Sequence, residues 1–336
     1  MSEFKSGFVA LIGRTNVGKS TLLNMLVGEK VAATANKVQT TRTAIKGIVN
    51  TVNSQIIFID TPGIHKPKTK LNETMVETSF GVLKDIDLIL FMIEATSTEI
   101  GRGDARILEK IKESGKKAIL LINKIDLIPR EKLLSLIEIY TREYDFEAVI
   151  PISSIKEKYR EVIIKEIEKN LKEGPAYYDT EEYTDQTMRT LAEETIREKA
   201  LVLLQDEVPH GILVEVTKMH LRENKQGQEI YDIEANIYCL RNSHKGIIIG
   251  KNGEMLKRIG SFARTDMEKN FGTKVNLKTW VKVKEDWQED NQIVKKFKLE
   301  NWWSKFWIEE VWGKIKYYWI KKVKMQKISL KEWGIW

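Results

Sequence analysis

The chain has 336 residues, 42% of them hydrophobic, which is enough apolar material for about two domains with separate cores. Its single cysteine, Cys239, lies in an apolar alternation, so disulfide frameworks and cysteine-based metal clusters are excluded and a core position is expected. The net charge of +7 comes from residues 291–336, which hold eleven lysines and four glutamates, while the rest carries 44 basic and 44 acidic side chains. Bulk charge therefore does not indicate nucleic-acid binding, and any basic surface has to be local.

In the first part of the chain, short runs rich in Ile, Val and Leu alternate with longer helix-like stretches. The predicted strands are residues 8–12, 56–60, 87–93, 117–122 and 148–152. Continuous apolar strands separated by helices indicate an α/β fold, a mostly parallel sheet with helices on both faces. A charged helix at 160–173 ends this domain, which we assign to residues 4–175.

A second pattern follows an acidic stretch, residues 176–190, that lacks helical periodicity and is interpreted as a linker. The predicted order is helix, strand, strand, helix, helix, strand. These elements are a helix from Leu191 to about Asp206, strands at 211–221 and 230–240, a short helix ending at 250–253, a helix at 253–270, and a strand at 275–283. This order predicts a smaller α+β domain over residues 191–287.

Residues 13–20, GRTNVGKS, follow a predicted strand and precede a helical pattern, which is the context of a phosphate-binding P-loop. Backbone N–H groups would surround the β-phosphate, Lys19 would neutralise β- and γ-phosphate oxygens, and Ser20 would ligate Mg²⁺. The helix N-terminus adds the positive end of its dipole. We assign phosphate binding to Gly13, Asn16, Val17, Gly18, Lys19, Ser20 and Thr21.

Two further segments complete a predicted phosphate and magnesium site. Residues 60–63, DTPG, end a strand, where Asp60 can reach Mg²⁺ through water and the Gly63 N–H can face the γ-phosphate. A loop that senses the γ-phosphate is expected between the P-loop helix and this strand, and we assign it to Gln39, Thr40, Thr41 and Arg42. The magnesium ligands are then Ser20, Thr41 and Asp60. Without the P-loop, these two segments would be interpreted as a turn and a solvated polar loop.

Residues 123–126, NKID, follow a strand and supply what a guanine site needs. The Asp126 carboxylate can accept from N1–H and the 2-amino group of guanine together, which adenine cannot satisfy. Ser153-Ser154 ends the next strand, where a backbone N–H can donate to guanine O6, although Ser-Ser alone is more often a turn or a helix cap. The predicted guanine site is Asn123, Lys124, Asp126, Ser153 and Ser154, and the predicted ligands are GTP and GDP.

Residues 250–253, GKNG, lie between two predicted helices. A GxxG loop there brings backbone close to phosphates and clamps about four nucleotides, as in KH modules. Residues 241–258 hold five basic side chains and one acid, a local excess in a neutral body. The alternative is the solvated face of a helix. The predicted RNA contacts are Lys245, Gly250, Lys251, Asn252, Gly253, Lys257 and Arg258.

Taken together, these motifs resemble a known family. Residues 7–175 look like a GTPase domain of the translation-factor-related class, and residues 60–68, DTPGIHKPK, resemble the Era family. The second domain resembles a type II KH domain, and residues 196–201, 244–253, 255–260 and 280–287 are similar to Era segments. The resemblance implies GTP hydrolysis, binding near the 3′ end of small-subunit ribosomal RNA, and a role in small-subunit assembly.

Several positions depart from related enzymes. Ras-type enzymes place a water-orienting glutamine after the DxxG glycine, whereas this chain has Ile64, so no catalytic side-chain base is identified. Related GTPases with a hydrophobic residue there hydrolyse slowly, and some recruit potassium through the asparagine that matches Asn16. His65 is interpreted as an exposed loop residue rather than a base. Thr15 stands where the family usually has Pro, and Ser154 where it usually has Ala.

The segment beyond residue 287 is treated as a tail, residues 288–336, which carries seven of the nine tryptophans together with eleven lysines. It indicates either an interfacial membrane helix or an extension without function. The chain has no apolar run of eighteen residues and no signal sequence at its start, so we expect a cytoplasmic monomer, with peripheral attachment to the inner membrane face as an alternative. A further alternative is an RNA-binding protein that binds nucleotide with little turnover.

Overall fold

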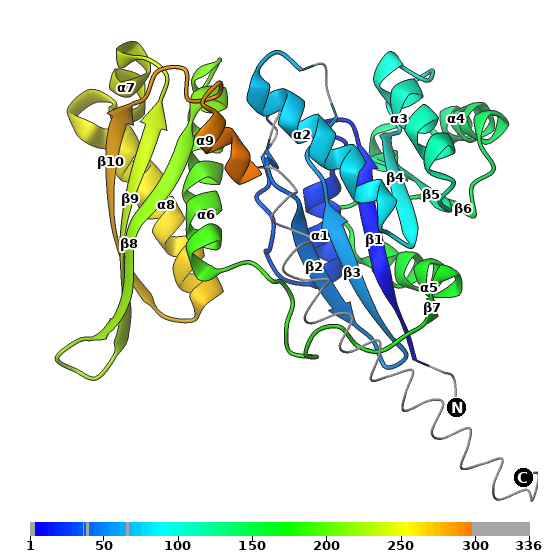
Figure 1. The fold of residues 1–336 in the computed structure, drawn as a ribbon, viewed down its shortest axis with the longest axis horizontal. Helices are drawn as coiled ribbons and strands as arrows, with labels where there is room; N and C mark the ends of the chain where they lie inside the picture. The colour runs from blue at the N-terminus through cyan, green and yellow to red at the C-terminus, as the bar shows by residue number, and fades with distance from the viewer. Residues whose placement is uncertain (1–3, 36, 38–39, 65–66, 298–336) are drawn as a thin grey trace, which may run out of the picture.

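The computed structural model of the chain describes residues 4–35, 37, 40–64 and 67–297. The predictions made for Gln39, for His65 and for the tail beyond residue 297 lie outside these ranges. Two units, the first α/β and the second α+β, lie side by side, the N-terminal unit on the right of Figure 1 and the C-terminal unit on the left. Over the described ranges, no helix has the length and hydropathy needed to cross a membrane.

The N-terminal unit is built on one mixed sheet with the path β2-β3-β1-β4-β5-β6. β1, β3, β4, β5 and β6 run parallel, β2 is antiparallel to β3, and β7 pairs antiparallel with the start of β1. The strands are β1 (Lys5–Gly13), β2 (Ile45–Asn50), β3 (Ser54–Asp60), β4 (Leu88–Glu94), β5 (Ala118–Asn123), β6 (Ala148–Pro151) and β7 (Lys172–Glu173). The mostly parallel sheet is confirmed. β2 was not predicted, because Lys46 and Gly47 interrupt its apolar pattern.

Helices cover both faces of this sheet. They are α1 (Lys19–Val27), α2 (Lys70–Gly81), α3 (Arg102–Ser114), α4 (Arg130–Glu143) and α5 (Arg160–Asn170). One core combines strand residues with Leu22 of α1 and Ile163 of α5, and the other with Ile107 of α3 and Leu136 of α4. Because both faces are covered, almost every residue of β1, β3 and β4 is buried, and these strands have continuous apolar sequences.

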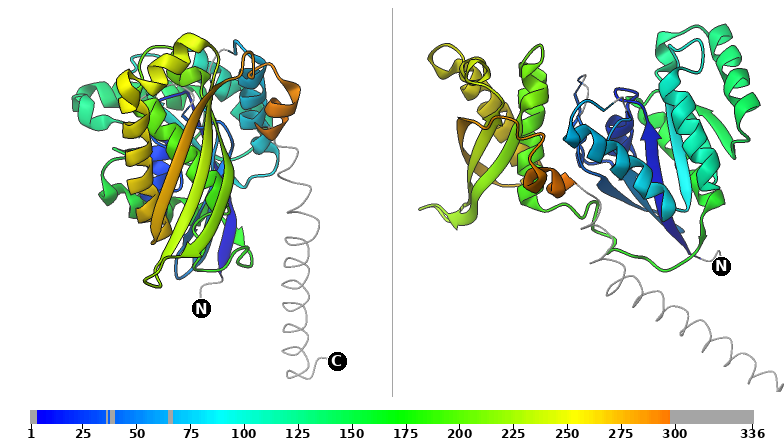
Figure 2. Two further views of the ribbon diagram at one scale, coloured as in Figure 1. Left: turned by 90° about the vertical axis from the view of Figure 1, so that its left-hand side faces the viewer. Right: turned by 45° about the horizontal axis from the view of Figure 1, so that its top comes forward.

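The C-terminal unit has the predicted element order. It contains α6 (Met188–Leu203), β8 (Leu213–Glu223), β9 (Glu229–Cys239), α7 (Asn242–Ile249), α8 (Glu254–Phe271) and β10 (Lys274–Val283). Its sheet has the order β10-β9-β8, in which β9 pairs parallel with β10 and antiparallel with β8. α6 and α8 pack on one face only, as the two views in Figure 2 show. Cys239 is buried in this core, as predicted.

Two segments pack more closely than their sequences suggest. The predicted linker follows the edge of the first sheet, where the backbone N–H groups of Tyr177 and Tyr178 donate to Gln55 and Asp185 pairs with Lys46 at 2.7 Å. The start of the predicted tail forms α9 (Asn291–Val294), which packs against α2. Hydrogen bonds and an ion pair hold the first segment, and a small apolar cluster holds the second. Neither segment has a local periodicity from which these contacts could be predicted.

Candidate nucleotide and RNA-binding sites

The P-loop joins the carboxyl end of β1 to the N-terminus of α1. The Lys19 side chain is buried and curls back over the loop, where its Nζ donates to the carbonyls of Gly13 (3.1 Å) and Arg14 (3.0 Å). Burial lowers the pKa of Lys19 to about 8, and the Asp60 carboxylate opposes that shift. A buried ammonium group beside a helix N-terminus suits phosphate oxygens.

Two glycines allow close backbone approach around this loop. Gly18 has a φ of 107°, and a Cβ there would lie 2.3 Å from Nδ2 of Asn123. A Cβ at Gly63 would lie 2.7 Å from Thr15 of the P-loop. A side chain at either position would therefore push the guanine-side loop or the segment after β3 away from the phosphate loop.

Ser20, Thr41 and Asp60 converge, as the predicted magnesium site requires. Ser20 Oγ lies 2.6 Å from Asp60 Oδ2 and 2.8 Å from Thr41 Oγ1. Asp60 is fully buried, and among the described residues its Oδ1 has no hydrogen-bond partner. Burial raises the pKa of Asp60, an effect that Lys19 and the two hydroxyls oppose. An unpaired buried carboxylate oxygen beside two hydroxyls fits a small, hard cation such as Mg²⁺.

Asn123 connects the P-loop with the guanine-side loop. Its Nδ2 donates to the Val17 carbonyl (2.7 Å) and to Ser154 Oγ (3.1 Å), and its Oδ1 accepts from the Ser154 N–H (2.8 Å). If the predicted backbone donor to guanine O6 is the Ser154 N–H, guanine would share that donor with Asn123 Oδ1. Asp126 is exposed, and a hydrogen bond from Ser153 lowers the pKa of the Asp126 carboxyl, which keeps it an acceptor.

These segments line one cleft of about 430 Å³, a size typical of small-ligand sites. The predicted residues that line it are Asn16, Gly18, Lys19, Ser20, Thr21, Thr40, Thr41, Gly63, Asn123, Lys124, Asp126, Ser153 and Ser154. Gly13, Val17 and Asp60 lie behind this lining, and Arg42 points to the C-terminal unit. The sequence analysis missed Thr34, Ala35 and Lys37, which line the cleft from a stretch without a recognisable motif.

Ile64 has a structural role. Its N–H donates to the Gly13 carbonyl at 3.2 Å, and it forms a parallel bridge with Arg14. The side chain is only 3% exposed and lies in the core next to the sheet. This aliphatic side chain packs in the core and cannot orient water. That no side chain serves as a catalytic base stays a prediction.

Arg14 anchors the P-loop from outside the cleft, a role that the sequence did not reveal. Its Nε donates to Asp104 at 3.0 Å, and the same carboxylate accepts from the Tyr140 hydroxyl at 3.2 Å. Burial raises the pKa of Asp104, and the Arg14 charge opposes this. Through these contacts with α3 and α4, the Arg14 side chain fixes the backbone whose carbonyl accepts the hydrogen bond from Lys19.

The predicted RNA loop connects α7 to α8. Gly250 and Gly253 have φ values of 73° and 79°, and Asn252 has a φ of 51°. A Cβ at Gly250 would lie 2.7 Å from Met255, so the turn requires glycine there. The predicted contacts Lys251, Asn252, Lys257 and Arg258 are exposed, and Lys245 is partly exposed. The sequence analysis did not include Ile247, which is 50% exposed in α7 before the loop.

Comparison with known proteins identifies both units. Residues 8–124 match the profile of the 50S ribosome-binding GTPase family, and residues 207–288 match that of the KH domain. GTPase Era of Caldanaerobacter subterraneus subsp. tengcongensis is 52% identical over 293 residues, which cover 87% of this chain and 97% of the relative. This chain belongs to the Era family of GTPases. GTPase Era of Clostridioides difficile is 49% identical over 295 residues, 88% of this chain and 98% of that protein.

Solved structures of Era are similar over both units. Era in complex with MgGDPNP and nucleotides 1506–1542 of 16S ribosomal RNA is 40% identical, with a TM-score of 0.83 over 88% of this chain and 98% of its own. A variant of Aquifex aeolicus Era bound to GDP.AlF4- is 39% identical, with a TM-score of 0.82 over 88% of this chain and 99% of its own. The predicted fold class, GTPase activity, guanine nucleotide and Mg²⁺ are confirmed.

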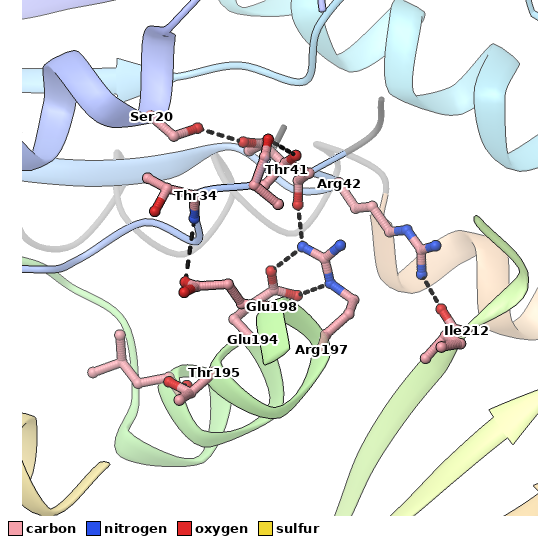
Figure 3. Close-up of polar contacts among 12 residues, drawn as sticks. Ser20, Thr34, Thr41, Arg42, Glu194, Thr195, Arg197, Glu198 and Ile212 are labelled. Atoms are coloured by element: carbon pink, nitrogen blue, oxygen red, sulfur yellow. Dashed lines mark hydrogen bonds and ion pairs between the residues drawn. The ribbon is translucent and has the colours of Figure 1, made fainter. Parts of the chain in front are cut away.

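In this Era-family chain, the loop at residues 40–42 lies between the cleft and the KH domain. While Thr41 faces Ser20 and Asp60, the next residue, Arg42, is 2% exposed and enters the KH domain. Arg42 donates to the carbonyls of Ile212 (2.5 Å) and His210 (3.1 Å). Figure 3 shows the Arg42 side chain reaching Ile212 and Arg197 approaching the loop from α6.

α6 of the KH domain holds the same loop from the other side. Arg197 donates to the Thr40 carbonyl and is itself paired with Glu194. Glu198 accepts from the backbone N–H of the cleft residue Thr34 at 3.2 Å and pairs with Lys30 at 2.8 Å. The cleft wall is therefore hydrogen-bonded directly to the KH domain.

The segment after Gly63 also contacts the C-terminal unit. Leu71 and Met75 of α2 pack against Trp287, Ile293 and Val294 in one apolar cluster. Trp287 is fully buried, and its indole N–H donates to the Gly211 carbonyl at 2.9 Å. The Arg42 guanidinium lies 5.2 Å from the ring centroid of Trp287. Both segments that flank the γ-phosphate position therefore meet the KH unit around one tryptophan.

Proposed function

We propose that this chain is a GTP-driven switch that binds the 3′-terminal region of small-subunit ribosomal RNA and assists assembly of the small ribosomal subunit. The proposal rests on the nucleotide cleft, on the exposed GKNG loop, and on the Era relative that was solved with nucleotides 1506–1542 of 16S ribosomal RNA. We further propose that the predicted site residues act as assigned, with Asp126 selecting guanine and Lys19 holding the phosphates.

The observation that carries the proposal is the position of two adjacent residues. Thr41 is at the magnesium site, where Mg²⁺ would bridge it to the γ-phosphate when GTP is bound. Arg42, next in the chain, is buried in the KH domain. Because one peptide bond joins them, holding Thr41 at the magnesium site also holds Arg42 in its KH contacts. Loss of the γ-phosphate would release both.

This coupling also gives the switch a direction. In the arrangement with Arg42 docked, Lys251, Asn252, Lys257 and Arg258 are exposed, so the RNA loop is accessible. GTP favours that arrangement through Thr41, and RNA binding therefore accompanies the GTP state. Hydrolysis, with the Gly63 N–H near the γ-phosphate and no side-chain base at residue 64, would then lower RNA affinity.

The experiment that tests the proposal changes the RNA loop and leaves the cleft intact. Replacing Lys251 and Asn252 by Asp puts two carboxylates where phosphates would pass, while both loop glycines remain. We expect the full-length variant to hydrolyse GTP at the wild-type rate without RNA and to lose most of its affinity for single-stranded 16S 3′-end RNA at physiological salt. Equal affinities and equal salt dependence in the two proteins would show that this loop does not hold RNA.

The remaining expectations are also proposals. We place the protein in the cytoplasm, where small ribosomal subunits assemble, and expect a monomer. Peripheral attachment to the inner membrane face remains a prediction, because it depends on residues beyond 297, which lie outside the described part of the chain. Vesicle flotation of the full-length chain and of a chain ending at residue 297 would test it, and that end point keeps α9 on α2.

A further inference from the structure

The KH sheet has one face without a helix. Along β10, Val275 and Val281 point into the core under α6 and α8, so residues 274, 276, 278, 280 and 282 point to the opposite face. In Figure 1 the three strands lie in front of α8, so this open face is turned towards the viewer. Residues 287–297 lie along its β8 edge, where they pack against Leu213 and Leu240 and where Lys296 approaches Glu215.

A tryptophan stands on this open face between two lysines. Trp280 is 44% exposed, and Lys278 and Lys282, its neighbours on the same face of β10, are exposed. Within the described part of the chain, neither lysine has an ion-pair partner. Lysines on an edge strand also prevent pairing with other chains. That role does not account for the indole ring at the surface between them, because tryptophan is on average largely buried.

The strand next to β10 adds a second aromatic ring. Tyr238 of β9 is opposite Lys282 in the sheet register, and the Lys284 ammonium lies 6.0 Å from its ring centroid. Tyr238 is at the end of β9 from which Arg241 and α7 lead to the GKNG loop. A strand of RNA that leaves the loop over Arg241 would therefore meet this end of the open face first.

Acidic side chains on the same face are mostly neutralised. Asp232 accepts from Arg222 at 2.6 Å and from Asn276 at 2.7 Å. Glu215 accepts from the Tyr238 hydroxyl at 3.0 Å and lies 3.8 Å from Lys296. Glu234 of β9 is the acidic residue on this face that is opposite a β10 lysine, Lys278, in the sheet register. The balance along β10 is positive and favours a phosphate backbone over an acidic or apolar partner.

We propose that the open face of the KH sheet around Trp280 binds a second stretch of RNA, beyond the nucleotides held by the GKNG loop. A KH groove takes about four nucleotides, so a longer RNA has further nucleotides available to contact other surfaces of the protein. Exposed aromatic rings flanked by lysines form a platform on which bases stack while phosphates follow the cations. This inference rests on the proposed function, because it takes the RNA to be continuous with the strand in the loop.

The test compares two RNAs on the full-length protein. One is nucleotides 1506–1542 of 16S ribosomal RNA. The other is its 3′-terminal strand of about ten nucleotides, which is long enough to fill a KH groove that holds about four nucleotides. Trp280→Ala should weaken binding of the long RNA by about 5-fold to 150-fold, the range for one lost stacked base, and leave the affinity for the short RNA unchanged. Lys278→Ala with Lys282→Ala should lower the long RNA's salt slope by about 1.4, at about 0.7 per phosphate contact.

Control variants separate contact from folding. Trp280→Tyr keeps an aromatic ring and should bind the long RNA within about twofold of wild type. Lys225→Ala with Lys269→Ala removes the same charge from exposed positions elsewhere on the KH domain and should lower the slope far less. Each variant's thermal unfolding is measured beside the wild type, and the lysine pair keeps the test valid if Trp280→Ala does not fold.

The outcomes distinguish this inference from the function on which it rests. If wild type binds neither RNA, the proposed function itself is wrong. If wild type binds both, and the Trp280 and lysine variants bind the long RNA as tightly as wild type, the open face does not hold RNA and only this inference falls. The inference is also overturned if the Trp280 and lysine variants bind isolated RNA normally but lose binding to purified small subunits. The open face of the KH sheet would then contact a ribosomal protein.

Discussion

Replacing Arg42 by Ala should uncouple the nucleotide site from the KH domain. Arg42 makes two hydrogen bonds to KH carbonyls and lies over Trp287, all in a buried setting. The His210 carbonyl keeps a second donor in Gln288 at 2.9 Å, so mainly the Ile212 carbonyl loses its partner. One charged hydrogen bond contributes about 1.5 to 3 kcal/mol and a desolvated cation–π contact about 2 kcal/mol. Burial, which lowers the pKa of Arg42 to about 9, offsets part of this.

The net loss of docking free energy is then about 3 kcal/mol, comparable to the 1 to 3 kcal/mol typical of coupling between two sites. The ratio of RNA affinities in the GTP-analogue and GDP states should therefore fall close to one in Arg42→Ala. The affinity for GTP itself should fall by no more than the coupling factor, because Arg42 does not line the cleft and acts only through Thr41. Fluorescence anisotropy with labelled RNA in both nucleotide states measures the ratio.

A matched control is Arg142→Ala, which removes an exposed arginine from α4 and only one surface ion pair. Such pairs contribute about 0 to 1 kcal/mol, so this variant should keep the wild-type ratio. If Arg42→Ala folds, binds GTP normally and still keeps the full ratio of RNA affinities, the reasoning about Thr41 and Arg42 is refuted.

Four further results are expected. Asp126→Asn should weaken GTP binding and shift preference towards xanthine nucleotide, because the amide places a donor where guanine N1–H needs an acceptor; unchanged GTP affinity would remove the guanine assignment. Lys19→Ala should abolish triphosphate binding or hydrolysis, whereas Ile64→Ala should lower stability by about 2 to 5 kcal/mol yet keep nucleotide binding, and loss of nucleotide by a folded Ile64→Ala would contradict this. The phosphates should raise the pKa of Lys19 from about 8, so GTP binding should take up a proton and weaken as pH rises above that value; calorimetry in two buffers that detects no uptake at pH 9 would contradict it. Potassium should accelerate hydrolysis relative to sodium, and Asn16→Ala should remove the difference; equal rates in wild type would exclude a potassium site.

The parts that sequence predicts well are those that depend on local patterns. Five strands of the first sheet and all helices and strands of the KH domain were predicted from apolar runs and periodicity. An element that is buried on one or both faces has a periodic or continuous apolar sequence. The P-loop and residues 60–63 were placed correctly because each follows a strand that ends at the same edge of a parallel sheet.

The contacts that connect the two units could not be predicted in this way. Arg42 and Trp287 are far apart in the chain, and a buried arginine over an indole has no periodic signature. The same holds for Glu198, which accepts from the Thr34 N–H across the interface. Tertiary packing determines these side-chain contacts. In our proposal, they transmit the nucleotide state of the cleft to the KH domain.

The most direct test of the account is reciprocity between the two ligands. Binding of the 16S 3′-end RNA is measured with a GTP analogue and with GDP, and binding of both nucleotides is measured with and without that RNA. The account predicts that the GTP analogue raises RNA affinity by at least about fivefold and that RNA raises the preference for the analogue over GDP by the same factor. Equal RNA affinity in the two nucleotide states would contradict the central claim that this chain is a GTP-driven RNA switch.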